Sequence, residues 1–345
     1  MVRNLIIPRG YRSHLDPLET EVAIKSIKDV FQTELARALN LRRITAPLLV
    51  KSGRGVNDDL NGTAGPVSFP VKDLNGAGVE IVQSLAKWKR MALAQLGLRP
   101  GEGLYTDMNA VRPGETLDNL HSLYVDQWDW ERIISRDERN LEFLAGIVKR
   151  IHAVLRKMEV FVHSLYPGLE PCLPPEIRFV HSAELEAEYP DLTPRERENA
   201  VCREAGAVFI LGIGAPLRQG QPHDGRAPDY DDWTTPTERG PGLNGDILFW
   251  YPLLETAMEI SSMGIRVDGE ALDIQLEMTG TASRKSLLFH RLLLDGKLPL
   301  SVGGGIGQSR LCMFFLKKAH IGEVQAGLWP DDMAEACRKN NMFLF

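Results

Sequence analysis

A glycine-rich stretch near the carboxyl end of the chain is the first candidate for chemistry. Residues 303–310 read Gly-Gly-Gly-Ile-Gly-Gln-Ser-Arg, and apolar residues follow them as in a buried helix. Glycine lets a backbone approach a ligand closely, and the planar cation of Arg310 can stack on a base or face phosphate charge. The stretch predicts a ligand-facing helix start with Arg310 in its first turns. A tight turn beside a surface arginine is the alternative.

Two defined nucleotide motifs do not fit this stretch. A dinucleotide fingerprint needs a third glycine at the Gly-x-Gly-x-x-Gly spacing, and a phosphate-binding P-loop needs Gly-Lys followed by Ser or Thr. Neither pattern is present. The prediction that remains is a glycine-rich element that presents an arginine to a base or a phosphate.

A lysine on an apolar helical stripe is the second candidate. On the helix predicted after residue 83, Lys89 shares a stripe with Ala86 and Leu93, whereas Lys87 and Arg90 point elsewhere. A lysine in that position either has an anionic partner or extends its ammonium back to water. Both interpretations of Lys89 stay open at this point.

A predicted hairpin carries the third group of polar residues. Residues 104–111 and 121–131 have the pattern of two strands, and the turn chemistry between them includes Arg112. At period two, Gln127 and Asp129 share a face that is apolar at its start and polar at its end. Tryptophans alternate with these residues, which argues against a fully solvated strand.

Carboxylates also gather in two predicted loops. Residues 51–65 hold Asp58 and Asp59, and such residues ordinarily make turns. Residues 226–233, Arg-Ala-Pro-Asp-Tyr-Asp-Asp-Trp, lie within a much longer loop. That cluster is either a metal or ligand site or an ordinary turn, and its position in a long loop favours function.

Two further strands are predicted at residues 246–251 and 257–266. On the second strand, Glu259 and Ser261 fall on one face at period two. A carboxylate and a hydroxyl are therefore expected to point in the same direction.

The remaining pattern supplies the framework. Apolar spacing predicts long helices at 19–39 and 137–165, and a strand at 44–49 that is entered through Pro47. Because that strand and helix expose more apolar surface than one subunit's edge should leave, we expect a homodimer through residues 19–49. Without repeats or linkers, residues 1–345 are expected to form one domain. Other predicted strands lie at 67–71, 79–82, 176–181 and 208–212, and helices start near 194, 271 and 283.

Composition limits the class of protein. A chain of 345 residues with 43% hydrophobic and 25% charged residues has an ordinary soluble enzyme profile. Its formal net charge of −6 disfavours nucleic acid as a partner. Four widely spaced cysteines indicate reduced thiols rather than a zinc site or a disulfide framework. With neither a signal sequence nor a membrane span in the pattern, we expect a cytoplasmic protein.

Together these motifs are similar to the ammonia-dependent asparagine synthetase family, the aspartate–ammonia ligases. The resemblance rests on residues 84–90, 125–131, 226–233, 261–266 and 303–310 and extends over nearly the whole chain. It implies an α+β fold like the catalytic domain of class II aminoacyl-tRNA synthetases, an antiparallel sheet flanked by helices in a homodimer. The helix at 19–39 with the following strand also resembles the first class II motif, which builds the dimer interface.

The resemblance also implies residue roles. Arg112 matches the arginine on the α-phosphate of ATP, Arg310 the arginine on the adenine side, and Glu259 a carboxylate that holds Mg²⁺. Ser122 and Ser261 are expected beside the nucleotide. Gln83 departs from the pattern, since many members have histidine there, which puts proton transfer at that position in doubt. Residues expected around the amino acid are Asp58, Ser84, Lys89, Gln127, Asp129, Asp231, Ser262 and Arg266.

The implied reaction joins L-aspartate and ammonia through a β-aspartyl-adenylate, with release of AMP and pyrophosphate. Lys89 and Arg266 would hold the carboxylates of aspartate, and Asp129 with Gln127 its α-amino group. Ammonia must attack as the free base, so a carboxylate should take its proton. Asp58 and Asp231 are both candidates, and the sequence does not choose between them.

Two other functions are compatible with parts of this pattern. A relative of aspartyl- or asparaginyl-tRNA synthetase would need an anticodon-reading module such as an OB-fold, which we do not expect in this chain. A catalytically idle relative with a regulatory role would have lost site residues, and only Gln83 departs. Both alternatives therefore account for this sequence less well than an aspartate–ammonia ligase does.

Overall fold

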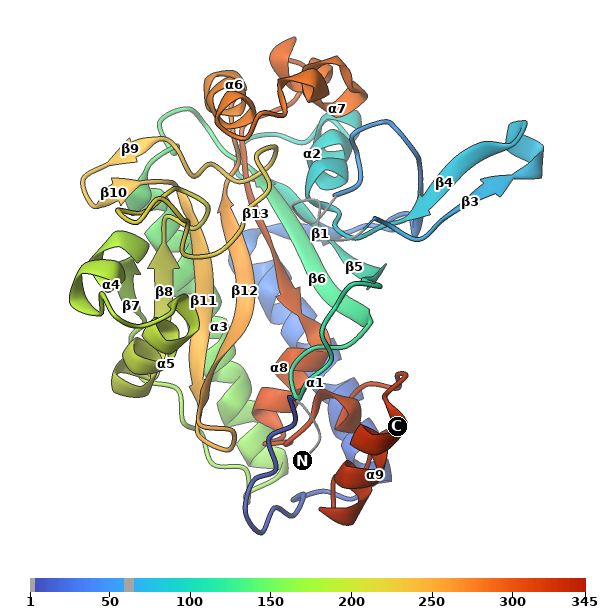
Figure 1. Ribbon diagram of the computed structural model, residues 1–345, viewed down its shortest axis with the longest axis vertical. Coiled ribbons are helices and arrows are strands. Elements are labelled where there is room, and N and C mark those ends of the chain that lie inside the picture. Colours follow the sequence, from blue (N-terminus) through green and yellow to red (C-terminus); the bar gives the residue numbers. More distant parts are fainter. Residues whose placement is uncertain (1–3, 59–64) are drawn as a thin grey trace.

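The centre of the molecule is a mixed sheet. The computed structural model describes residues 4–58 and 65–345, so Asp59 lies outside the described residues. Within them, eight strands form one sheet in the order β1-β5-β6-β13-β12-β11-β8-β7 (Figure 1). All neighbours are antiparallel except at the two edges, where β1 pairs with β5 and β7 with β8. The strands are β1 Leu41–Arg43, β5 Gly103–Val111, β6 Tyr124–Ile133, β7 Arg178–His181, β8 Ala207–Leu211, β11 Asn244–Tyr251, β12 Thr256–Ile265 and β13 Ser301–Gly307.

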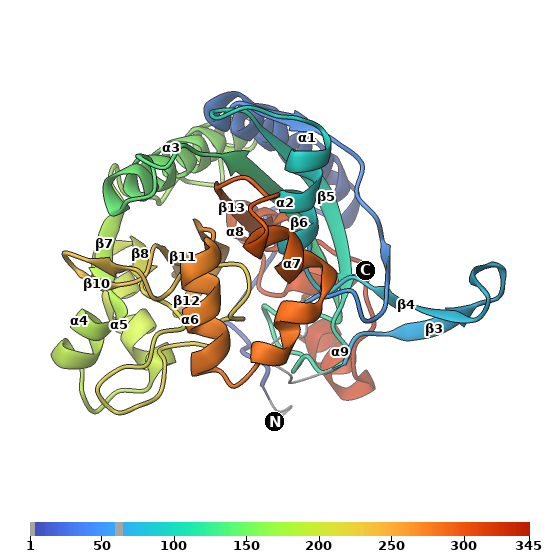
Figure 2. The ribbon, with the colours of Figure 1, turned by 90° about the horizontal axis from the view of Figure 1, so that it is seen from above.

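Helices cover this sheet, which makes the fold α+β as predicted. Figure 2 shows α1 and α3 side by side along one face, where Phe31 packs against Trp128 in the main core. None of the described helices has the length and apolar character needed to cross a membrane. The helices are α1 Pro17–Leu39, α2 Ala86–Gln95, α3 Leu141–Leu165, α4 Ser182–Glu188, α5 Pro194–Ala205, α6 Gly269–Met278, α7 Leu288–Leu294, α8 Gln308–Phe315 and α9 Asp331–Lys339, with 3-10 turns η2 Lys72–Leu74, η3 Ala282–Ser286 and η4 Ile321–Glu323.

Local sequence signals explain the ends of the long helices. Asp16 caps α1 in a reciprocal capping box with Glu19, and Pro17 occupies its first turn. Asn40 ends the helix in the left-handed conformation, which asparagine tolerates. Asn140 caps α3 through the backbone N–H of Phe143. The two predicted long helices are therefore confirmed.

A smaller sheet projects from the body. It has the order β2-β4-β3, with β2 Leu49–Lys51, β3 Ser68–Val71 and β4 Ala77–Ile81, and the β3–β4 hairpin extends away from the rest of the molecule (Figures 1 and 2). The strand predicted at residues 44–49 is wrong. The chain pairs with β5 at Leu41–Arg43 and resumes pairing only at Leu49. Pro47, which has no N–H to donate, lies in the gap between the two strands. A third small pair joins β9 Pro236–Thr237 to β10 Gly240–Pro241.

The polar hairpin strand behaves as its alternation predicts. Trp128 and Trp130 of β6 are fully buried on the α1–α3 side, while Gln127 and Asp129 line a cavity on the other side. The antiparallel pairing of β5 with β6 confirms the predicted hairpin. One face of this strand therefore builds the core and the other the cavity.

Three cations of α2 are buried, although the helical stripe predicted burial of only one of them. Lys89 is buried as predicted, but Lys87 and Arg90 are buried too. Lys87 Nζ lies 3.0 Å from Asp229 Oδ2, and Arg90 donates to the carbonyl oxygens of Val267 and Pro299. Partners from distant segments contact α2 on several sides. The burial of its cations therefore depends on tertiary contacts and not on one apolar stripe of the helix.

Candidate active site

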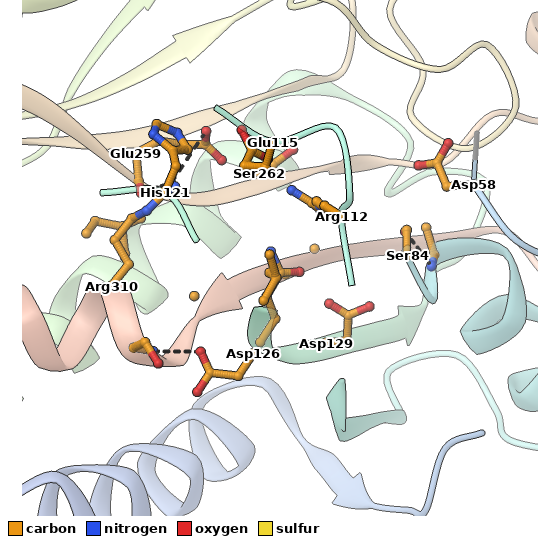
Figure 3. Close-up of a pocket in the computed structure, with 18 of the residues that line it drawn as sticks. Asp58, Ser84, Arg112, Glu115, His121, Asp126, Asp129, Glu259, Ser262 and Arg310 are labelled. Atoms are coloured by element: carbon orange, nitrogen blue, oxygen red, sulfur yellow. Dashed lines mark hydrogen bonds and ion pairs between the residues drawn. The ribbon is translucent and has the colours of Figure 1, made fainter. Parts of the chain in front are cut away.

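One cavity of about 350 Å³ is lined by almost every site residue predicted from the sequence. This main cavity opens over the sheet face opposite α1 and α3, and Figure 3 shows side chains from distant segments converging on it. Twelve of the nominated residues line it: Asp58, Ser84, Lys89, Arg112, Ser122, Gln127, Asp129, Asp231, Glu259, Ser262, Arg266 and Arg310.

Ser261 is the nominated residue that does not line the main cavity. The pairing of β11 with β12 shifts register here, because Ile247 pairs with Ser261 and the next residue, Leu248, pairs with Glu259. This β-bulge breaks the period-two alternation, so Ser262 and not Ser261 lines the cavity with Glu259. The prediction that Glu259 and Ser261 point together is wrong. Ser261 is buried, and its hydroxyl has no hydrogen-bond partner among the described residues.

The cavity has two ends. In Figure 3, Glu259, His121 and Arg310 gather at one end, Asp58 and Ser84 lie at the other, and Arg112 extends between them. A second cavity of about 250 Å³ adjoins the Arg310 end and shares His121, Glu259 and Arg310 with the main cavity. The site is long enough to hold two groups of different chemistry side by side.

The glycine-rich stretch forms strand β13 beside the cavity, not a tight turn. A Cβ on Gly303 would lie 1.9 Å from Glu131 Oε2, and one on Gly305 would lie 2.3 Å from Gln127 Oε1. None of the glycines in β13 needs a positive φ, so side-chain space is what excludes other residues. Helix α8 then begins at Gln308, with Arg310 in its first turn, as predicted.

Lys89 is fixed beneath this strand. Its Nζ lies 3.0 Å from the carbonyl oxygen of Gly304, 3.1 Å from that of Trp130 and 3.2 Å from Asp129 Oδ2. Burial lowers the pKa of Lys89, against the attraction of Asp129 and Glu131. Three acceptors match the three ammonium protons, so the lysine connects β6, β13 and the Asp129 carboxylate.

Arg266 is held by two buried carboxylates. Its Nε and Nη2 donate to Glu131 at 3.0 and 2.9 Å, and its Nη1 donates to Asp231. Although burial opposes the charge, these carboxylates raise the pKa of Arg266 above its ordinary value. This leaves one proton on each terminal nitrogen without an acceptor among the described residues. A permanently charged, oriented guanidinium therefore faces the cavity.

Two further arginines serve the cavity. Arg310 Nη1 donates to the carbonyl oxygen of Glu259 at 2.8 Å. Arg112 reaches the carbonyl oxygen of Gln83 only at 3.5 Å, and its buried Nε has no partner among the described residues. Since a guanidinium offers five donors, Arg112 retains most of its hydrogen-bonding capacity for a ligand.

Carboxylates crowd together where the main and second cavities meet. Asp246 and Glu259 lie on the neighbouring strands β11 and β12. Burial, together with Glu259 and Asp224, raises the pKa of Asp246 to about 8, although Arg226 Nη2 lies 2.6 Å from its Oδ1. No group of three or more potential metal ligands of the His, Cys, Asp or Glu type forms within the described ranges.

The acidic loop segment divides its carboxylates among three surroundings. Asp229 is buried beside Lys87, Asp231 pairs with Arg266, and Asp232 pairs with Arg139. Asp231 alone of the three lines the main cavity. Each of these carboxylates therefore has a cationic partner of its own.

Comparison with known proteins identifies the family. The profile described as aspartate-ammonia ligase matches residues 18–341. The chain belongs to this family. Proteins named aspartate–ammonia ligase from Bacteroides thetaiotaomicron and Clostridium perfringens (strain 13 / Type A) are each 56% identical to it, over 341 and 343 residues. These matches cover 99% of this chain, and 99% and 100% of the two relatives.

Solved structures of lower identity share the fold. The asparaginyl-tRNA synthetase of Entamoeba histolytica aligns with a TM-score of 0.63 at 15% identity, over 90% of this chain and 67% of that one. The asparaginyl-tRNA synthetase of Pyrococcus horikoshii complexed with asparaginyl-adenylate aligns with a TM-score of 0.61 at 17% identity, over 90% and 70%. The ligase chain therefore has the class II synthetase fold that its motifs implied.

Sequence reasoning missed several residues of the ligase site. Asp126 Oδ1 accepts from the N–H of Ser309 at the start of α8, and its Oδ2 lies 3.0 Å from Lys28 Nζ. The Ser122 hydroxyl donates to Gln325 Oε1 at 2.6 Å, so its hydrogen is already used within the protein. Motif positions could have suggested Asp126. Others that line the cavity or hold its residues are Glu115, His121, Asp224, Arg226, Tyr230, Glu131, Asp246 and Gln325.

Gln83, the departure from the family pattern, is fully buried and does not line the main cavity. Its carbonyl oxygen faces Arg112, and its N–H donates to Asn57 Oδ1 at 2.8 Å. The backbone of residue 83 therefore links the segment that carries Ser84 to Asn57 and Arg112. These contacts do not depend on which side chain occupies the position.

Proposed function

We propose that this ligase makes L-asparagine from L-aspartate and ammonia at the expense of ATP, through a β-aspartyl-adenylate. The observation that carries the proposal is that one continuous cavity in a member of this family holds both sets of groups the reaction needs. Arginines with unfilled donors suit a nucleotide, and paired charges beside β13 suit an amino acid.

The first step activates the side-chain carboxylate of aspartate. A carboxylate oxygen attacks the α-phosphorus, the bond from that phosphorus to the bridging oxygen breaks, and pyrophosphate leaves. Like charges meet in this step, so a preorganised cation is required. Arg112 supplies it, since it lies between the two ends of the cavity and keeps free donors, and Arg310 holds the nucleotide.

Glu259 and Asp246 fit the Mg²⁺ that such a reaction uses. Burial first, and then the neighbouring carboxylates of Glu259 and Asp224, raise the pKa of Asp246, and a divalent cation beside these groups would favour the charged carboxylate. Two carboxylates with phosphates and water as the other ligands suit magnesium, which seldom uses an all-protein cage. When bound, Mg²⁺ would neutralise phosphate charge. Glu259, nearly half exposed, would hold it from the protein side.

Charge pairs at the other end suit the amino acid. Arg266 directs its remaining protons to the α-carboxylate, while Asp129 and Gln127 accept from the α-ammonium. Lys89 has protein acceptors for all three of its protons. We therefore propose that it positions Asp129 and does not contact a carboxylate of the aspartate substrate. The Ser84 and Ser262 hydroxyls complete the surroundings of the substrate.

The second step transfers the acyl group to ammonia. The lone pair of ammonia attacks the acyl carbon, the bond to the AMP oxygen breaks, and one N–H proton must leave. Asp231 is paired with Arg266 and lies 3.6 Å from Arg226 Nε, so two cations already engage its carboxylate. We therefore choose Asp58, buried at the far end of the cavity from Arg310, as the proton acceptor.

The assembly and location of the ligase are also proposals. Val22 on α1 is 63% exposed and Leu48 is 52% exposed, which supports a homodimer through residues 19–49. A monomeric mass in sedimentation at micromolar concentration would contradict it. Four free cysteines suit a reducing cytoplasm.

Isotope labelling tests the adenylate. Aspartate labelled with ¹⁸O in its side-chain carboxylate should transfer one label to AMP as asparagine forms, and pyrophosphate should stay unlabelled. Other ATP-dependent amide formers pass through an acyl phosphate and release ADP. Label in inorganic phosphate, with ADP as the nucleotide product, would refute attack at the α-phosphorus.

A further inference from the structure

A third cavity, of about 200 Å³, lies beyond the main cavity. Asp58 lines both of them. The third cavity is bounded by the base of the β2-β4-β3 sheet, through Lys51 and Glu80, and by Leu287 and His290 at helix α7. None of the roles given above to the active site uses it.

Two segments separate the main and third cavities and contribute to both. In α2, Lys89 lines the main cavity and Lys87 the third. In the acidic loop, Asp231 lines the main cavity and Asp229 the third. Because the site already fixes Lys89 and Asp231, the third cavity is held directly beside the site of acyl transfer.

Asp229 has one oxygen saturated and the other unfilled. Its Oδ2 accepts from Lys87 Nζ at 3.0 Å, His290 Nε2 at 3.1 Å and Arg284 Nη1 at 3.3 Å. Burial would raise the pKa of Asp229, but Lys87 and His290 hold it well below the ordinary value, so the group is charged. Its Oδ1 is buried and has no partner among the described residues. A buried carboxylate oxygen without a donor is costly, which calls for a small donor molecule.

His290 provides a second unfilled acceptor. In the neutral imidazole, Nε2 carries the proton because it faces the Asp229 carboxylate, and Nδ1 is then an acceptor. Nδ1 is buried, has no partner in the described part of the chain, and lies 3.1 Å from where a Cβ on Gly55 would be. Gly55, which lines the cavity with a φ of +66°, leaves room beside this nitrogen for the Leu287 side chain, whose Cβ would lie 2.8 Å from a Cβ at position 55.

The charges of the third cavity select a neutral guest. Its lining includes the cations Lys51, Arg54, Lys87 and Arg284 and the carboxylates Asp58, Glu80 and Asp229. Three donors already surround one Asp229 oxygen. An ammonium ion would meet Lys87 and Arg284 at close range, whereas ammonia brings three N–H donors and no charge.

We propose that the third cavity is the route by which neutral ammonia reaches the acyl carbon, held on the way by Asp229 and His290 and passing Asp58 into the main cavity. The proposal rests on the proposed function. At the junction the nitrogen attacks the acyl carbon, the bond to AMP breaks, and the released proton goes to Asp58.

A plug in the third cavity tests the route. Leu287 lines this cavity and not the main one, so Leu287→Trp should obstruct passage without touching aspartate or ATP. We expect kcat/KM for ammonium to fall about tenfold or more, while aspartate-dependent ATP–pyrophosphate exchange and KM for aspartate stay within about twofold. Leu294→Trp is the matched control, since Leu294 is the last residue of α7, the helix that Leu287 precedes, is 38% exposed and lines none of the three cavities. It should change neither quantity.

A second variant keeps the test decisive if Leu287→Trp does not fold. Leu287→Ala widens the cavity and should raise kcat/KM for methylamine relative to ammonia by about threefold or more. Unchanged ammonium kinetics in a folded Leu287→Trp, equal loss of exchange and asparagine formation, or unchanged amine selectivity in Leu287→Ala would overturn the route. Absence of aspartate-dependent exchange in the unmodified protein would instead refute the proposed function, and the route with it.

Discussion

Glu131 accepts two hydrogen bonds from Arg266 at 2.9 and 3.0 Å, and both side chains are buried within the sheet. The same carboxylate accepts from the Ser301 hydroxyl at 2.7 Å and lies 3.9 Å from Lys89 Nζ. Gly303 stands opposite Glu131 in the pairing of β13 with β6, and a Cβ there would overlap the carboxylate. The glycine strand thus makes room for the anion that orients Arg266.

Glu131→Gln should therefore destabilise the protein. Removing one partner leaves Arg266 and Lys89 as buried cations with less compensation, for which we expect a loss of about 3 kcal/mol or more in the free energy of unfolding. Urea denaturation measures it. Glu335→Gln removes an exposed pair with Lys339 and should change the midpoint little. Equal stability of the Glu131 variant and the parent would contradict the network.

The same variant predicts a dependence on pH. Burial would raise the pKa of Glu131, but Arg266, Lys89 and Ser301 together hold it below the ordinary value. A carboxyl with a depressed folded pKa stabilises the protein above its unfolded pKa of about 4.3, and that contribution disappears as the pH falls through the folded pKa. The stability difference between parent and Glu131→Gln should thus be largest near neutral pH and shrink in acid. A constant difference would assign the loss to packing.

Arg112→Lys should lose most of the activity although the charge remains. A point ammonium cannot reproduce the forked donors that face phosphate and carboxylate oxygens together, so we expect kcat to fall by about 10² or more. Arg43→Lys, an exposed pair with Asp107 outside the three cavities, is the control. Near-parental turnover of the Arg112 variant would show that another residue contacts the α-phosphate.

Arg310→Ala should weaken ATP binding and leave the fold intact. Its guanidinium lines both the main and second cavities and is held by the carbonyl oxygen of Glu259. We expect the Kd for ATP to rise about tenfold or more, measured by nucleotide titration. Exposed Arg338→Ala on α9 should leave the affinity unchanged. An unaltered Kd for ATP in the Arg310 variant would show that this arginine does not bind the nucleotide.

Gly305→Ala should impair aspartate binding selectively. The added methyl would lie 2.3 Å from Gln127 Oε1 and 2.7 Å from Asp129 Oδ1, the two acceptors assigned to the α-ammonium. We expect KM for aspartate to rise about tenfold or more with little change in the affinity for ATP. Gly146→Ala in α3 meets no atom within 4 Å and should be neutral or slightly stabilising. A parallel rise for both substrates would point to general damage of the sheet.

Local patterns in the sequence were enough to predict the long helices and the two faces of β6. Capping residues set both long helices, and the period-two alternation of β6 assigned Trp128 and Trp130 to the core and Gln127 and Asp129 to the opposite face. These features depend on neighbours within a few positions, where backbone geometry alone dictates the outcome. Motif resemblance added the family and twelve residues that share one cavity.

Tertiary structure decided the rest. A bulge in β12 exchanged Ser261 for Ser262 in the cavity, and such a shift depends on the partner strand β11. Partners more than a hundred positions away buried Lys87 and Arg90. Cations from three other segments divided the acidic loop among three surroundings. The proposal of Asp58 over Asp231 as proton acceptor also rests on the fold, because the pairing of Asp231 with Arg266 is visible only there. Charges select their partners through space, and the spacing of residues along the chain does not record those distances.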